Sequence, residues 1–255
     1  MFDITINETL AAIVQGKKVA VIGPAPYLKG KNLGKVLEDY DVVCRINEFM
    51  TPEDLVKDYG ERTDIMFHNF GTPWMKPHKE KIESNQDCFK QLKLVVCPAI
   101  KSEHAETNYL SWPDDYVSNV VRNFNDVETG DVPFYWLGIR DYKKIYSSVG
   151  AESNTGMLAI MMLLHYPIKE LLVSGFTFYL GGNTYDDLYY RGHFPQEHID
   201  GNTFGIHAGH GYHANMRQIE VFKALCSKFG PIIKVDSFIN NLLQMQHPSL
   251  LKIEE

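Results

Sequence analysis

Short runs of consecutive apolar residues recur along the chain and predict its fold. A run without polar alternation is typical of a strand that is buried on both faces of a parallel sheet. Such runs lie at 17–23, 40–47, 64–69, 92–97, 171–176 and 232–235. Helical segments are expected between them at 33–37, 155–165 and 214–229. The alternation predicts an α/β fold with a Rossmann-like, doubly wound and mostly parallel sheet.

Two segments interrupt this alternation and are expected to contain loops. Residues 101–150 are polar and aromatic with weak periodicity, which indicates loops and one or two helices. Residues 180–212 are rich in glycine and histidine, a composition typical of a mobile loop beside a binding site. We therefore interpret 1–255 as a single domain in which 180–212 is a small lid insertion that also faces the acceptor.

The charge balance of the 255-residue chain argues against a nucleic-acid partner. There are 25 basic and 32 acidic residues, which gives a formal net charge of −7. Such a chain lacks the positive field with which proteins hold nucleic-acid phosphates. An anionic ligand would have to be bound locally, by backbone amides, hydroxyl groups and a few side chains.

Cysteine spacing and N-terminal composition favour a reduced, cytoplasmic protein. The four cysteines are widely separated and form no CxxC pair. The N-terminus shows no basic segment followed by an apolar core, and no stretch approaches about 18 apolar residues. These features predict neither a signal peptide nor a transmembrane segment. They leave open peripheral contact with a membrane and oligomerisation.

Residues at the predicted strand ends are candidates for a nucleotide site. The turn after the first strand contains Gly23 and Ala25 but no GxGxxG fingerprint, which disfavours a dinucleotide enzyme. The next two strands end at Asn47 and Asn69, whose side-chain amides can each donate and accept hydrogen bonds. Each feature alone is also typical of an ordinary turn, so only their combination indicates a site.

A second group of candidates surrounds the long apolar helix and the strand after it. Ser153-Asn154-Thr155-Gly156 precedes the helix and supplies a hydroxyl cap and amides that favour an anion. Phe176 ends the following strand. Tyr179 and Tyr185 lie six residues apart around a Gly-Gly pair. Two phenols on such a loop can donate hydrogen bonds to a departing phosphate.

His213 lies directly before the last long helix and is the candidate general base. An imidazole titrates near neutral pH and can accept a hydroxyl proton there. Five histidines between positions 193 and 213 also raise the alternative of a metal hydrolase. However, no HExxH motif is present and the spacing does not place the histidines on one helix face, so no metal is expected.

Taken together, these segments resemble the CMP-sugar-dependent sialyltransferases, most closely glycosyltransferase family 42 and more weakly family 29. Residues 19–47 resemble the first donor-binding block, and 153–179 resemble the second. Tyr185 keeps the six-residue spacing from Tyr179, and His213 with the helix after it resembles the last block. Residues 71–150 are nearly unmatched. The resemblance implies a GT-A-variant form of the Rossmann-like sheet.

The resemblance also implies an activity and a set of roles. The enzyme would move a sialic-acid-type sugar from CMP-Neu5Ac to a glycan or glycolipid acceptor, as in lipopolysaccharide or capsule synthesis, with no cofactor. The two strand-end asparagines and Thr155 would contact the donor. The two tyrosines would hydrogen-bond the departing phosphate, and His213 would deprotonate the acceptor hydroxyl for an inverting displacement.

Two positions depart from the family pattern and keep alternatives open. Pro24 stands where the family usually has asparagine, and Glu152 stands where it carries arginine. A carboxylate near an anionic donor is unfavourable unless it is protonated or paired. One alternative is therefore a CMP-Kdo transferase that retains configuration, with Glu152, Asp186 or Asp187 as nucleophile. The other is a non-catalytic module that binds CMP-sugars or glycans.

Overall fold

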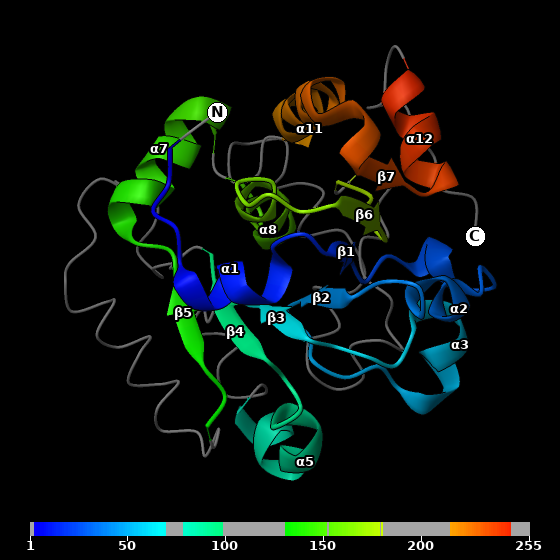
Figure 1. Cartoon of the computed structure of the whole chain (residues 1–255). Helices are drawn as coiled ribbons and strands as arrows, with labels where there is room; N and C mark the ends of the chain where they lie inside the picture. The colour runs from blue at the N-terminus through cyan, green and yellow to red at the C-terminus, as the bar shows by residue number, and fades with distance from the viewer. Residues whose placement is uncertain are drawn as a thin grey trace.

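A parallel β-sheet runs through the middle of the molecule (Figure 1). The computed structural model describes residues 3–69, 79–98, 131–151, 153–178, 180 and 215–245. Within them, the sheet has seven strands, and every neighbouring pair is parallel. The strands are β1 (Lys18–Ile22), β2 (Val42–Ile46), β3 (Ile65–Phe67), β4 (Leu94–Cys97), β5 (Phe134–Trp136), β6 (Glu170–Ser174) and β7 (Ile233–Val235). The predicted Rossmann-like sheet is confirmed.

The strand order changes direction at β1. The order is β5-β4-β3-β2-β1-β6-β7, so the chain runs outward from β1 to β5 and then returns to β6 on the other side of β1. The register between these two central strands pairs Ile22 with Ser174 at their carboxyl ends. In open α/β sheets, ligands bind outside the carboxyl ends of the strands where the order reverses. The end of the β1–β6 pair is therefore the switch point of this fold.

Helices cover both faces of the sheet (Figure 1). The largest apolar cluster packs one set against one face: α1 (Glu8–Val14), α7 (Ile139–Val149), α8 (Thr155–Leu163), α11 (Asn215–Phe229) and α12 (Ser237–Gln244). Two smaller clusters pack shorter elements against the other face: η1 (Pro26–Leu28), α2 (Leu33–Leu37), η2 (Glu53–Leu55), α3 (Val56–Tyr59) and α5 (Gln86–Phe89). The turn η4 (Gly230–Ile232) leads from α11 into β7.

Helix α8 is the central helix of the largest cluster. All nine of its residues are buried, because its sequence offers no polar face to solvent. Its N-cap is Asn154, whose Oδ1 accepts a hydrogen bond from the Met157 amide at 2.7 Å. The helix therefore begins at a fixed residue beside the carboxyl edge of the sheet.

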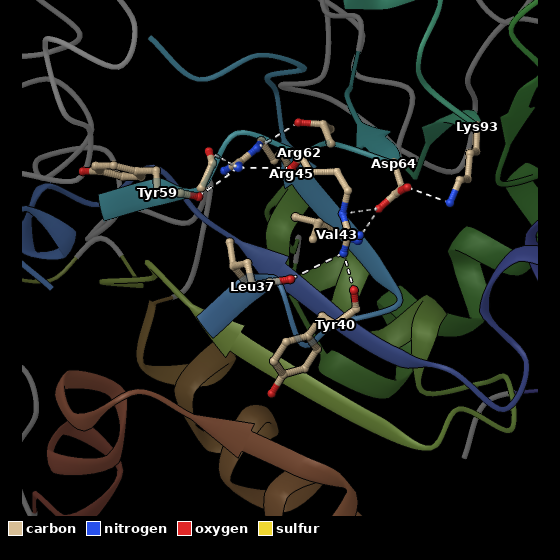
Figure 2. A network of polar contacts seen from close by, with 10 residues as sticks. Leu37, Tyr40, Val43, Arg45, Tyr59, Arg62, Asp64 and Lys93 are labelled. Carbon is tan, nitrogen blue, oxygen red and sulfur yellow. Dashed lines mark hydrogen bonds and ion pairs between the residues drawn. The ribbon is translucent and has the colours of Figure 1, made fainter. Parts of the chain in front are cut away.

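A buried arginine ties β2 to the segment after α3 (Figure 2). Arg45 lies in β2 and is fully buried. Its guanidinium donates to the carbonyl oxygens of Tyr59 and Gly60 at 2.8 and 2.6 Å, and to Thr63 Oγ1 at 2.9 Å. A buried charge is tolerated only when it is hydrogen-bonded. Arg45 therefore has a structural role on the face of the sheet between the two smaller clusters.

A carboxylate at the amino end of β3 joins further segments (Figure 2). Asp64 accepts a hydrogen bond from the Val43 amide at 2.8 Å and pairs with Lys93 at 2.7 Å and Arg62 at 3.3 Å. Arg62 also donates to the carbonyl of Tyr40. These contacts fix the amino edge of the sheet, opposite the switch point.

Several observed elements differ from the sequence prediction, and α3, α5 and α12 are among those not predicted. The segment 101–150, where loops and one or two helices were expected, contains the edge strand β5 as well as helix α7. Strand β5 has three residues and Trp136 is 37% exposed, so it lacks the buried apolar run of the central strands. Helix α1 was not predicted either.

The predicted lid, 180–212, lies outside the described residues except for Leu180. No helix in the described ranges is long and apolar enough to span a membrane.

Candidate functional site

The floor of the switch point is formed by two turns whose main chains touch. Gly23 follows β1 and Gly175 follows β6, and a Cβ on either would lie within 3.0 Å of the other's carbonyl group. The Gly23 amide donates to the Ser174 carbonyl at 2.8 Å, and the Ala25 amide donates to the Gly175 carbonyl at 3.2 Å. These glycines are required by the close approach of the two turns, so main-chain atoms form the surface here.

The start of α8 closes one side of the crevice. A Cβ at Gly156 would lie within 3.0 Å of the Phe176 ring, so glycine lets the helix pack directly on the residue that follows the β6 turn. The Asn154 amide donates to Gln218 Oε1 of α11 at 3.1 Å. The helix start is thereby held against both β6 and α11.

Two residues at this edge have an unusual backbone conformation. Within the described ranges, three non-glycine residues have positive φ, and two of them are Asn47 at 57° and Phe178 at 52°. Asparagine tolerates this conformation, whereas for phenylalanine it costs about 1–2 kcal/mol. The Phe178 ring packs on Phe222 of α11 with 5.4 Å between centroids, which holds the strained turn in place. Strain of this kind is concentrated at binding and catalytic sites.

Several polar atoms near this edge have no hydrogen-bond partner among the described residues. They are Asn47 Oδ1, Ser153 Oγ and Thr177 Oγ1, and the two hydroxyl side chains are each 2% exposed. A buried polar group without a partner destabilises the fold by about 1–3 kcal/mol. A ligand with several hydroxyl or amide groups would supply the missing partners.

A tyrosine and an aspartate that the sequence analysis did not identify hold the β6 turn. Tyr27 Oη donates to Asp236 Oδ2 at 2.7 Å and accepts from the amides of Gly175 and Phe176 at 2.8 and 3.0 Å. Ser174 Oγ also donates to Asp236 Oδ2, at 2.6 Å. Burial, and then the Asp236 carboxylate, raise the pKa of Tyr27 well above its usual value. The neutral phenol therefore occupies two amides of the turn, and a ligand must use others.

A buried ion pair, also missed by the sequence analysis, lies beyond the end of β2. Glu48 is fully buried and pairs with Lys81. Its Oε1 accepts from the amides of Phe49 and Met50 at 2.8 and 3.3 Å. No short motif marks such a pair, because its members are 33 residues apart.

The end of β3 supplies a buried histidine and asparagine. His68 is 1% exposed, and burial lowers its pKa to about 3, so the imidazole is neutral at physiological pH. Asn69 is also buried, and its carbonyl accepts from Cys97 Sγ at 3.8 Å. This histidine is unsuited to act as a general base near pH 7, because a pKa near 3 makes it a weak proton acceptor.

The structure places the predicted donor-binding residues at one edge of the sheet. They are Gly23, Ala25, Asn47, Asn69, Ser153, Asn154, Thr155, Gly156 and Phe176. The other predicted site residues lie outside the residues that the structure describes: Glu152, Tyr179, Tyr185, Asp186, Asp187 and His213. The histidines between 193 and 213 lie outside them too. The roles of all these residues stay predictions.

Comparisons with known proteins agree with this architecture. A family model described as glycosyltransferase family 29 (sialyltransferase) matches residues 13–224. The crystal structure of a mammalian sialyltransferase is 14% identical, with a TM-score of 0.51 and with 91% of this chain and 73% of that chain covered. A mammalian sialyltransferase in complex with Gal-beta-1-3GalNAc-ortho-nitrophenol is 15% identical, with a TM-score of 0.49 and coverage of 91% and 74%. A comparison with curated proteins finds no match.

The family match spans most of the chain, whereas the solved structure with a TM-score of 0.51, at 14% identity, bears on the fold alone. The matched family is the second of the two that the sequence resembles. The matched residues include β1, β2 and β6, whose ends form the crevice, and most of α11. The chain belongs to glycosyltransferase family 29 and is a glycosyltransferase of the sialyltransferase type.

Proposed function

We propose that this enzyme transfers a sialic-acid-type sugar from a CMP donor to a hydroxyl group of a glycan acceptor. The observation that carries the proposal is the group of unsatisfied polar atoms at the switch point, on Asn47, Ser153 and Thr177. A cytidine nucleotide and a polyhydroxylated sugar both present hydrogen-bond donors and acceptors that match such atoms. Membership of a sialyltransferase family supports CMP as the nucleotide.

The start of α8 is suited to the phosphate of such a donor. The first amides of a helix have no partner within the helix, and the helix dipole favours an anion there. The first turn of α8 has no acidic residue. Because Asn154 already accepts from the Met157 amide, the amides of Thr155 and Gly156 are the ones that a phosphate would contact.

The proposed chemistry uses three residues beyond the crevice floor. His213 removes the proton of the acceptor hydroxyl as its oxygen bonds to the anomeric carbon of the sugar. The bond from that carbon to the CMP oxygen breaks at the same time, and the configuration inverts. Tyr179 and Tyr185 donate hydrogen bonds to the phosphate as its charge develops, so the reaction needs no metal. Family membership and the order of the sequence blocks support these roles.

A panel of nucleotide sugars tests the donor assignment. We expect CMP-Neu5Ac at a hundredfold excess over its Kd to stabilise the folded enzyme by about 2.7 kcal/mol, because it binds only the folded state. UDP- and GDP-sugars should not shift the unfolding temperature. Release of CMP in the presence of a galactose-terminated acceptor should continue in EDTA. Stabilisation by CMP-Kdo alone, or binding without CMP release, would contradict the proposal.

Replacement of the candidate base tests the mechanism. The variant His213→Ala should transfer about 10²- to 10⁴-fold more slowly, the range expected for loss of a general base, while its Kd for CMP stays near the wild-type value. His165→Ala is the matched control, because this histidine lies beyond the last residue of α8, away from the crevice. Transfer by His213→Ala at the rate of the control would rule out the role of His213.

A further inference from the structure

The buried ion pair between Glu48 and Lys81 lies directly beside Asn47. Glu48 is 0% and Lys81 8% exposed. One carboxylate oxygen accepts from two successive amides, of Phe49 and Met50, while the other meets the ammonium group. The ammonium also lies 5.6 Å from the centre of the Phe49 ring. The pair thus fixes the three residues after Asn47 by four separate contacts.

A buried ion pair contributes little net stability to a fold. Removing two charges from water costs as much as, or more than, their attraction returns, and apolar residues of similar volume often serve as well. Apolar packing is available here, since Phe49 belongs to the cluster that includes Ile82 and Phe89. A directional contact, in contrast, can fix one conformation of a turn.

The conformation that needs fixing is that of Asn47. Its φ of 57° lies in the left-handed region, and its Oδ1 has no hydrogen-bond partner in the described part of the chain. No hydrogen bond to a described residue therefore holds this oxygen, and its position depends on the backbone that carries the side chain. On the N-terminal side, the Asn47 amide donates to the Phe67 carbonyl at 2.7 Å. On the C-terminal side, the first fixed group is the Glu48 carboxylate held by Lys81.

Lys81 comes from a different part of the site. The segment that carries it follows β3 and Asn69, the second predicted asparagine of the donor site. The ion pair thus joins the chain that leaves β2 to a segment that follows β3. We infer that Glu48 and Lys81 are positioning residues that hold Asn47 in its left-handed conformation for contact with the nucleotide of the donor. The inference rests on the proposed function and extends it to residues that do not touch the donor.

Breaking the ion pair tests this inference, and the readout is whether the donor KM changes while kcat does not. Lys81→Met leaves the Glu48 carboxylate without its partner, and we expect the donor KM and the Kd for CMP to rise about ten- to a hundredfold, as is typical when a supporting residue is lost. The acceptor KM and kcat should stay within about twofold, because the lost contact is made equally in the ground and transition states. Lys81→Arg keeps the charge and should restore most of the donor affinity.

Lys93→Met is the matched control. Lys93 pairs with Asp64, a buried carboxylate that also accepts from a backbone amide of β2, but it does so at the amino edge of the sheet. This variant should lower the free energy of unfolding and leave the Kd for CMP within about twofold. An equal loss of CMP affinity in both variants, or in neither, would overturn the inference.

Two further measurements keep the test decisive. If Lys81→Met does not fold, Glu48→Gln/Lys81→Met removes both charges and should fold with the same rise in donor KM; a normal KM would contradict the inference. Hydrogen exchange needs no donor, and the amides of Phe49 and Met50 should exchange at least tenfold faster in Lys81→Met than in Lys93→Met. Unchanged exchange refutes the positioning role. A wild-type enzyme that binds no CMP refutes the proposed function instead.

Discussion

The glycines at the crevice are required because other protein groups pack directly against them. Gly23 and Gly175 approach each other through main-chain atoms, and Gly156 lies against the ring of Phe176. The sequence analysis placed Gly23 at a turn, Gly156 at a helix start and Gly175 within the predicted strand 171–176. It could not indicate the packing partner, because that depends on which strands become neighbours. The same limit applies to Tyr27 and Asp236, whose contact joins positions 209 residues apart.

The variant Gly156→Ala tests this packing. Its Cβ would overlap the Phe176 ring, and we expect a loss of about 1–3 kcal/mol in the free energy of unfolding, as is usual for overpacking. CMP binding should weaken as well, because the start of α8 would move away from the β6 turn. Urea denaturation and calorimetric titration measure the two effects.

Gly230→Ala is the control for this change. A Cβ at Gly230 would meet no atom within 4 Å, and its φ is not positive. The same chemical substitution should therefore leave stability within about 0.5 kcal/mol, as for other surface positions, and donor binding unchanged. Equal effects of the two alanines would show that the contact with Phe176 is unimportant.

Elements with complete burial or a regular apolar face were predictable, whereas the partly buried β5 and α1 were not. The central strands β1, β2 and β6 are continuous apolar runs because helices cover both of their faces. Helix α8 was predicted for the same reason. Strand β5 lies at the sheet edge with three partly exposed aromatic residues, and α1 buries only Leu10 and Val14, so neither has a distinctive pattern. The gathering of the candidate donor-binding residues at one edge of the sheet was predictable, because strand ends and a helix start define it; their roles in donor binding stay predictions.

At the scale of the whole molecule, His68 connects pH with stability. Burial lowers its pKa from 6.5 to about 3 in the folded chain. At pH values between about 3 and 6.5, His68 is protonated in the unfolded chain and neutral in the folded chain, so the unfolded chain binds one more proton. The free energy of unfolding should therefore fall as the pH is lowered below about 6.5, by up to about 1.4 kcal/mol per pH unit from this residue.

Urea denaturation between pH 7.5 and pH 5 checks this expectation. His68→Leu removes the titrating group, and its stability should depend less steeply on pH than that of the wild type over this range. Identical slopes for His68→Leu and the wild type would show that the folded chain does not exclude the proton from His68.

The contact between the Gly23 and Gly175 turns has a consequence for biosynthesis. One turn is translated early, the other only after the chain has built β1 to β5, and the aspartate that secures the second turn comes later still. A nascent chain that stops at β5 contains the Gly23 turn but lacks the Gly175 turn that packs against it. On the proposed function, the donor site would therefore be completed only late in synthesis, and a chain that ends at β5 would lack the residues of its β6 side.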